Sequence, residues 1–192
     1  MPTSCTAKRA PLALILTLLL VASGGAARAA GAPQSTAPDF TLLDQHGRSF
    51  TLSQHRGQPV VLFFGYANCP DVCPTILANL ERARTAIGPR GSDVVVAMVT
   101  VDPKRDTPAA LGRFVSVFDP SFLGLTGTAA QLALAYRAYH VRSAEQNGSS
   151  TDYLVAHTAF VYYIGRDGRI RGFGTWNDSQ AILQESLRAI AG

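Results

Sequence analysis

The chain has 192 residues, 47% of them hydrophobic and 16% charged, so it is long enough to bury one sizeable core. Its formal net charge is +4, but Lys8, Arg9 and Arg28 lie near the N-terminus, and without them 14 basic residues face 13 acidic ones. A balance so close to neutral gives no case for nucleic-acid binding.

The N-terminal residues have the pattern of an export signal. Lys8 and Arg9 form a positive n-region, residues 12–22 are apolar, and residues 27–29 (Ala-Arg-Ala) offer a small-residue cleavage site. The apolar run is short for a membrane span of about 20 residues, and only its extension to Ala27 reaches a marginal span. We predict a signal peptide or N-terminal membrane anchor over 1–29, a linker over 30–38, and an exported, periplasmic domain over 39–192, soluble or tethered to the inner membrane.

From residue 39 onward the pattern is that of one α/β domain without repeats. The apolar run 59–66 predicts a strand buried on both faces, and the helix after it ends at Gly88-Pro89. Strands that alternate with helices imply an α/β sandwich with a central mixed sheet flanked by helices and an N-terminal hairpin. The predicted strands are 40–43, 49–52, 59–66, 93–101, 122–125, 158–164 and 170–174, and the predicted helices are 75–87, 107–118, 128–139 and 179–191.

Cys69 and Cys73, with three residues between them, follow the central strand, where such sheets place their sites. Each cysteine precedes a proline, which disfavours helical backbone, so we expect both in a loop, with Pro74 opening the helix. Cys73 would then lie at a helix N-terminus, where the helix dipole and free N–H groups favour a thiolate.

Two thiols so close in sequence can form a disulfide, exchange one, or hold a soft metal. An exported protein can keep a disulfide, and if the leader is removed, Cys69 and Cys73 are the only cysteines left, because the third is Cys5. A structural disulfide is the plain alternative. A bridge across so few residues, however, closes a small loop and adds little chain-entropy stabilisation.

Residues 65–75 (Gly-Tyr-Ala-Asn-Cys-Pro-Asp-Val-Cys-Pro-Thr) resemble the motif of the Sco/SenC family of copper-binding, thioredoxin-like proteins. Three more segments resemble family segments in the same order, and the last of them resembles the one that carries the family's histidine ligand. They are 101–108 (Val-Asp-Pro-Lys-Arg-Asp-Thr-Pro), 124–128 (Gly-Leu-Thr-Gly-Thr) and 152–158 (Asp-Tyr-Leu-Val-Ala-His-Thr). The resemblance covers most of the chain and implies a thioredoxin-like α/β fold.

The resemblance also implies a metal site of Cys69, Cys73 and His157 that binds copper. Two thiolates and an imidazole suit Cu(I), with Cu(II) as the other oxidation state, although the same ligands with a water would also hold zinc. An isolated histidine near an apolar strand is usually just a packed residue. His157, however, opens the predicted strand 158–164, the place where thioredoxin-like folds put a cis-proline that faces the cysteines.

Two positions depart from the family pattern. Ala67-Asn68 stands where family members commonly carry Thr-His, and Ala156 stands where an aspartate often precedes the histidine and would tune metal affinity. The other polar and sulfur-bearing candidates are expected in structural places. We expect His46 and His55 at the surface, His140 at a helix end, Met98 in the core, Asp71 and Asp152 facing solvent, and Arg105 paired with Asp106.

The implied function is that of a copper chaperone, which delivers copper to the copper A centre of cytochrome c oxidase. Its partner would be the oxidase subunit that carries this centre, and other periplasmic copper carriers or thiol reductases are further expected partners. The alternative is a thiol–disulfide reductase in which Cys69 and Cys73 are the redox pair. A peroxidase is disfavoured, because Pro70 stands where peroxiredoxins carry Thr or Ser three residues before the reactive cysteine.

Overall fold

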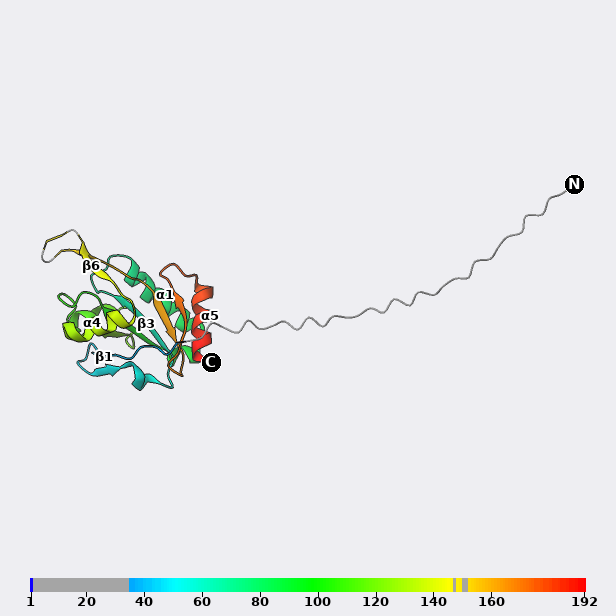
Figure 1. The fold of residues 1–192 in the computed structure, drawn as a ribbon, viewed down its shortest axis with the longest axis horizontal. Coiled ribbons are helices and arrows are strands. Elements are labelled where there is room, and N and C mark those ends of the chain that lie inside the picture. The colour runs from blue at the N-terminus through cyan, green and yellow to red at the C-terminus, as the bar shows by residue number, and fades with distance from the viewer. Residues whose placement is uncertain (2–34, 147, 150–151) are drawn as a thin grey trace. The chain divides into compact units, whose positions relative to one another are not determined.

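The computed structural model describes residue 1 and residues 35–146, 148–149 and 152–192 (Figure 1). Apart from Met1, the predicted leader over 1–29 lies outside the described residues, as does most of the predicted linker over 30–38. Within the described ranges, no helix is long and apolar enough to cross a membrane.

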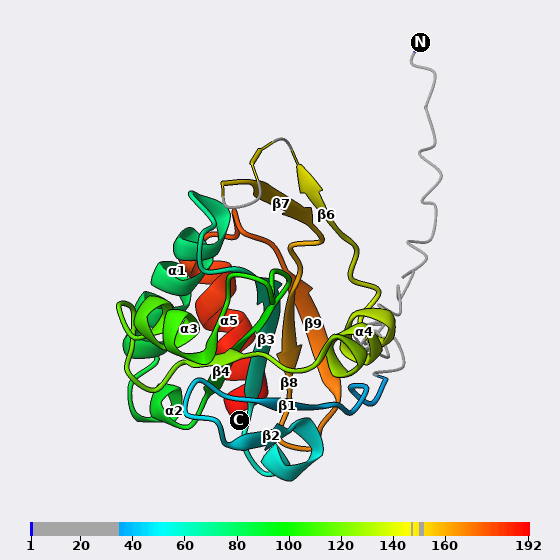
Figure 2. The ribbon, with the colours of Figure 1, turned by 90° about the vertical axis from the view of Figure 1, so that its left-hand side faces the viewer.

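The centre of the fold is a five-stranded mixed sheet in the order β5-β4-β3-β8-β9 (Figure 2). The strands β3 (Val60–Gly65), β4 (Val95–Thr100) and β5 (Leu123–Leu125) are parallel. In contrast, β8 (Val161–Ile164) is antiparallel to β3, and β9 (Ile170–Gly174) is antiparallel to β8. The predicted mixed sheet is confirmed.

Every residue of β3 is buried, as the continuous apolar run predicts, because both faces of the sheet are covered. Side chains alternate along the strand, so Val61 and Phe63 join one hydrophobic cluster while Leu62 and Phe64 join the other. Gly65 pairs with Thr100, so β3 and β4 end at the same edge of the sheet. The residues that follow these two strands therefore meet at that edge.

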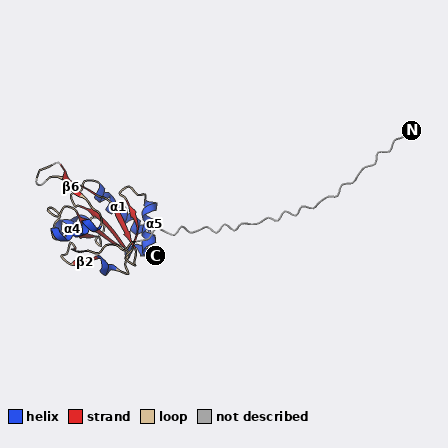
Figure 3. Ribbon diagram, in the orientation of Figure 1, coloured by secondary structure: helices blue, strands red, loops and turns tan. Residues whose placement is uncertain are grey.

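Three helices, α1 (Val72–Ala86), α3 (Pro108–Val115) and α5 (Gln180–Ala191), cover one face of the sheet. Figure 3 labels two of them, α1 and α5. The single-turn helix α2 (Pro89–Ser92) follows α1. Side-chain caps start two of the long helices, as the hydroxyl of Thr107 accepts a hydrogen bond from the backbone of α3 and that of Ser179 does the same for α5.

The opposite face is covered by α4 (Ala129–Ala138) and by the N-terminal hairpin of β1 (Thr41–Leu43) and β2 (Ser49–Thr51). The short 3₁₀ helix η1 (Leu52–His55) continues from β2. Buried side chains of all four elements share one cluster with β3 and β4. The predicted N-terminal hairpin and flanking helices are confirmed.

A second hairpin, β6 (Ser143–Gln146) with β7 (Leu154–His157), was not predicted. All four residues of β6 are exposed, so no alternation of apolar and polar residues marks this strand in the sequence. The strand predicted over 158–164 begins only at Val161, because the chain up to His157 belongs to β7. His157 thus ends one strand, and the prediction that it opens the next is wrong.

Candidate metal and thiol site

The cysteine loop connects β3 to α1 and comprises residues 66–71. Cys69 lies in this loop, but α1 begins at Val72, so Cys73 is already in the first helical turn and the prediction of two loop cysteines is half wrong. Pro74 is the third helical residue, where a missing N–H costs nothing, because the first turn of a helix has no intrahelical acceptors for its N–H groups. This tolerance is why the X-Pro pattern misplaced the helix start.

The two thiols have different surroundings. Cys73 is fully buried, and its Sγ packs so closely on β3 that a Cβ added to Gly65 would lie 2.8 Å from it. Cys69 is half-buried, and its Sγ accepts a hydrogen bond from the backbone N–H of Cys73 at 3.4 Å. Both are free thiols in this structure.

These contacts make Cys69 the thiolate. Hydrogen bonds from the Cys73 thiol and from the N–H groups of Cys73 and Asp71 outweigh burial and lower the pKa of Cys69 to about 5. The hydrogen bond to Cys69, together with burial, raises the pKa of Cys73. The prediction that Cys73 is the favoured thiolate is wrong, because the N–H groups of Asp71 and Cys73 at the start of α1 donate to the sulfur of Cys69.

His157 approaches Cys73 from the β6–β7 hairpin. Its Nε2 is 3.9 Å from Cys73 Sγ, and its Nδ1 is 3.0 Å from the carbonyl oxygen of Thr158. A carbonyl only accepts, so Nδ1 carries the proton and donates it to Thr158, which leaves the lone pair of Nε2 directed at the thiol. This is the orientation that a metal-binding imidazole needs.

The distance between Cys73 and His157 suits a shared metal ion. Metal–sulfur and metal–nitrogen bonds of about 2.3 and 2.0 Å at trigonal angles put the two ligand atoms about 3.7 Å apart. Two thiols and an imidazole are also a donor set that soft Cu(I) prefers. Within the part of the chain that the structure describes, however, no three His, Cys, Asp or Glu side chains are already gathered as a complete metal site. Completing one requires some side-chain movement.

Tyr66 links the loop to the hairpin, a role that the sequence did not reveal. Its hydroxyl accepts a hydrogen bond from Val155 N at 3.3 Å, and its ring lies edge-on to His157 with 5.9 Å between centroids. Burial raises the pKa of Tyr66. The Gly-Tyr pair that precedes the cysteines is the sequence signal that points to this residue.

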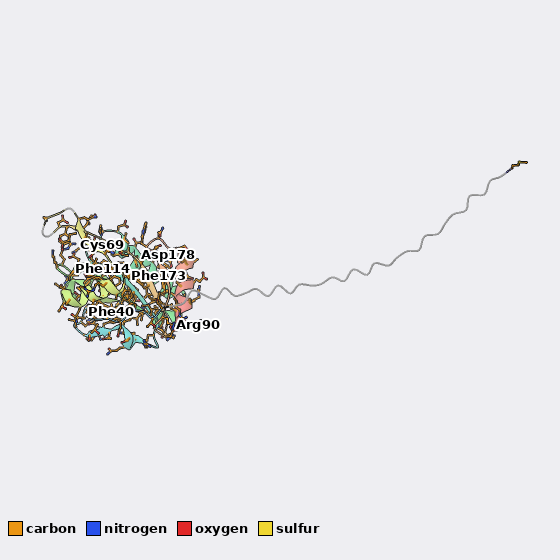
Figure 4. All side chains as sticks on the ribbon, viewed as in Figure 1. Phe40, Cys69, Arg90, Phe114, Phe173 and Asp178 are labelled. Carbon is orange, nitrogen blue, oxygen red and sulfur yellow. The ribbon has the colours of Figure 1, made fainter. Side chains whose placement is uncertain are left out.

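An open pocket of about 320 Å³ is bordered by the cysteine loop and the β6–β7 hairpin. Cys69 and His157 line it together with Tyr66, Pro70, Leu154 and Ala156. Cys69, labelled in Figure 4, accordingly lies at the end of the domain that carries β6. A partner that enters this pocket meets the sulfur of Cys69, whereas Cys73 is buried behind it.

The acidic residues near the site differ from the expected pairing. Arg105 pairs with Asp102 at 2.5 Å, and the predicted pair with Asp106 is wrong. Asp106 instead accepts a hydrogen bond from Thr100 Oγ1 at 2.6 Å, and burial raises its pKa to about 6. Asp71 and Asp152 are exposed, as expected.

The remaining candidates do not join the site. His46 and His140 are exposed, and His55 stacks on Phe50 with 4.4 Å between ring centroids. Met98 is fully buried in β4, as expected for a core residue. Of the residues singled out from the sequence, Cys73 contacts both Cys69 and His157.

Comparisons with known proteins identify relatives. The profile of the family described as SCO1/SenC matches residues 28–192. A mitochondrial SCO2 homolog from Bos taurus is 39% identical over 153 residues, which cover 78% of this chain and 58% of the relative. An SCO2-like protein from Rickettsia conorii is 33% identical over 152 residues, 78% of this chain and 74% of the relative. The chain thus spans little more than half the length of the bovine relative.

Solved structures agree with the sequence comparisons. Bradyrhizobium japonicum ScoI with copper bound is 34% identical, with a TM-score of 0.74 over 81% of this chain and 99% of that chain. Yeast Sco1 with copper bound is 32% identical, with a TM-score of 0.73 over 81% of this chain and 87% of that one. The fold is the thioredoxin-like α/β architecture of these proteins, and the chain belongs to the SCO1/SenC family.

Proposed function

We propose that this protein is a copper chaperone that binds copper through Cys69, Cys73 and His157 and passes it to the copper A centre of cytochrome c oxidase. The observation that carries the proposal is the 3.9 Å approach of His157 Nε2 to Cys73 Sγ, with the imidazole already oriented by Thr158. Two relatives more than 30% identical to this chain are described with copper bound. The proposed acceptor rests on the resemblance to the family, which implies a role in the assembly of cytochrome c oxidase.

Copper is the cargo here, and the asymmetry of the two thiols suggests an order of transfer. Cys69 is already a thiolate, whereas Cys73 must release a proton before it can bind the metal. An incoming acceptor thiolate reaches the half-buried side of the site, so it displaces Cys69 first. His157 and the buried Cys73 then hold the metal until further acceptor ligands take it over. Oxidation of the two cysteines to a disulfide would also release the copper, if an external disulfide takes up the two electrons and is reduced to a dithiol.

Anaerobic titration of the reduced protein with Cu(I) against a competing chelator tests this proposal. We expect one copper per chain, with little binding left in the Cys69→Ser and Cys73→Ser variants. We expect His157→Ala to weaken binding at least about tenfold, since it removes one of three ligands. Binding that is not stoichiometric in the wild type, or unchanged affinity in His157→Ala, contradicts the proposal.

A thiol–disulfide reductase is the second candidate, and the state of Cys69 favours it. The Cys69 thiolate would attack an acceptor disulfide, forming a mixed disulfide and releasing one acceptor thiolate. Cys73, after losing its proton, would attack Cys69 Sγ, release the second acceptor thiolate and leave a Cys69–Cys73 disulfide. The acceptor gains two electrons, and a separate dithiol must reduce the pair again.

The His157→Ala variant distinguishes the two candidate functions. Reductase activity should survive His157→Ala and disappear with Cys69→Ser or Cys73→Ser, whereas replacing any of the three residues should weaken copper binding. The roles are compatible, because copper insertion needs reduced acceptor thiols.

The proposal includes an exported, periplasmic location, with or without a membrane tether through residues 1–29. It also includes other periplasmic copper carriers or thiol reductases as partners.

A further inference from the structure

The segment from Thr100, the last residue of β4, to Asp106 contacts both the cysteine loop and the β6–β7 hairpin. Neither proposed activity uses it. Three of its polar residues, Thr100, Asp102 and Asp106, are each no more than 3% exposed. A loop that buries a hydroxyl and two carboxyl groups gains little hydrophobic stabilisation, because burying polar groups costs free energy unless partners satisfy them. The partners of these side chains therefore indicate what the segment holds.

On one side the segment holds the cysteine loop. Both carboxyl oxygens of Asp106 accept from the backbone N–H of Ala67 at 3.2 Å, and one also accepts from Thr100 Oγ1 at 2.6 Å. Ala67 is the second residue of the cysteine loop, two residues before Cys69. A buried carboxyl group thus fixes the start of the loop to the end of β4.

On the other side it holds the β6–β7 hairpin. The hydroxyl of Tyr153, next to β7, donates to Asp102 Oδ1 at 2.7 Å, and Arg105 Nε donates to Asp102 Oδ2 at 2.5 Å. The guanidinium of Arg105 lies over the Tyr153 ring, with Cζ 3.6 Å from the centroid. Tyr153 is therefore fixed through both its hydroxyl and its ring face.

Stability of the fold alone does not explain the position of Arg105. Its Nη2 is buried and has no hydrogen-bond partner among the described residues. A buried donor without a partner costs about 1–3 kcal/mol. Stacking of the guanidinium on Tyr153 requires this position, so the arrangement favours a fixed Tyr153 over a fully satisfied arginine.

Fixing Tyr153 fixes the direction of His157. Side chains alternate along a strand, so Tyr153, Val155 and His157 share one face, with Tyr153 and Val155 buried. Leu154 and Ala156 alternate with them, are exposed, and border the pocket that Cys69 and His157 also line. A slip of the hairpin by one residue would turn His157 toward solvent.

We propose that the segment Thr100–Asp106 is a positioning brace: Asp106 holds the cysteine loop, the Asp102–Arg105–Tyr153 cluster holds β7, and together they keep His157 beside Cys73. The brace deepens the proposed copper function, since its purpose rests on His157 acting as a ligand. Its first test does not require copper.

The first test is amide hydrogen exchange in the reduced, metal-free, full-length chain. We expect Tyr153→Phe, which loses only the hydroxyl, and Arg105→Gln, which loses the stacked charge, each to speed exchange at residues 154–157 about tenfold or more. Exchange in β3 should change much less. Unchanged exchange at 154–157 in both variants would overturn the brace.

Arg84→Gln is the matched control. Arg84 is also a largely buried arginine, paired with Asp119 at 2.8 Å and lying 5.1 Å over the Phe122 ring, but on α1 away from the hairpin. It should lower overall stability without selective loosening of β7. Selective loosening of β7 by this variant as well would also count against the brace.

A double-mutant cycle gives the second test. With His157 present, Tyr153→Phe should weaken Cu(I) binding about tenfold, the size typical of groups that orient a ligand. In the His157→Ala background, the same change should leave Cu(I) affinity unaltered. An equal loss in both backgrounds means that Tyr153 only stabilises the fold, which overturns the positioning role. If His157→Ala alone leaves affinity unchanged, the copper proposal fails, while hydrogen exchange still decides whether the brace exists.

Discussion

The two cysteines and the histidine come from regions of opposite character. The cysteine loop continues from β3, a strand that is buried at every residue, and Cys73 packs against that strand with no room for a methyl group on Gly65. The β6–β7 hairpin is a separate two-stranded sheet whose first strand is fully exposed. The core therefore holds the thiols, whereas a few specific side-chain contacts hold the imidazole.

The largest expected effect concerns Asp106, the buried carboxyl group that ties the two regions together. Burial raises its pKa from 3.8 to about 6 in the folded protein, so folding favours its protonated form. Below about pH 4 Asp106 is protonated whether the chain is folded or unfolded, so it does not lower the free energy of unfolding. The loss of stability grows as the pH rises from about 4 to about 6, where it reaches about 3 kcal/mol.

Urea unfolding of the reduced, metal-free protein between pH 4 and 7 measures this cost. Relative to wild type, Asp106→Asn should gain stability as the pH rises through this window, because asparagine has no charge to bury. A stability difference that stays constant from pH 4 to 7 would show that Asp106 does not have a raised pKa. In that case the hydrogen bonds from Ala67 and Thr100 stabilise its charged form enough to offset burial.

The second effect tests how tightly the core holds Cys73. Gly65→Ala places a Cβ 2.8 Å from Cys73 Sγ and 3.2 Å from Met98 Sδ, which should lower the free energy of unfolding by about 2 kcal/mol. Gly172→Ala, in β9, is the control, since its Cβ meets nothing within 4 Å. Equal stability of the two variants in urea unfolding would mean that the thiol side of the site is as adaptable as the hairpin.

Sequence patterns predict the first region well, because its signals are local. The apolar run that forms β3, the glycine before the loop and the two X-Pro cysteines are each recognisable within a few residues. The start of α1 was misplaced by two to three residues, since proline is tolerated in the first turn and leaves no sharp boundary. The choice of Cys69 as the thiolate could not be predicted, because it depends on which sulfur faces the N–H groups of Asp71 and Cys73.

The second region is nearly invisible in the sequence. Its strand β6 is polar and exposed, and β7 is held by Arg105 and Asp102, about 50 residues earlier in the chain. The motif that contains Asp102, Arg105 and Asp106 was recognisable, yet it suggested an Arg105–Asp106 pair. Adjacent opposite charges in a sequence suggest an ion pair between them. In the fold, Arg105 pairs with Asp102 on the side of the hairpin, and Asp106 accepts from Ala67 on the side of the cysteine loop.

A third prediction compares the two thiols chemically. With its pKa lowered to about 5, Cys69 is fully ionised at pH 7, whereas a free thiol with a pKa near 8.5 is only a few per cent thiolate. Alkylation of reduced, metal-free protein should modify Cys69 in preference to the buried Cys73, with the rate half-maximal near pH 5. Mass spectrometry locates the label. Preferential labelling of the buried Cys73 would contradict the assigned order of attack.

The smallest expected effect separates the brace from ordinary surface contacts on the same hairpin. Lys104 reaches β6 through an ion pair with Glu145 at 2.6 Å, but both side chains are more than half exposed. Such pairs contribute about 0–1 kcal/mol and weaken with salt. Lys104→Gln should therefore change hydrogen exchange at 154–157 by less than about fivefold, and 0.5 M salt should abolish the difference. If it loosens β7 as much as Tyr153→Phe does, general electrostatic attraction holds the hairpin, and the buried Asp102–Arg105–Tyr153 cluster has no special part in directing His157 toward the thiols.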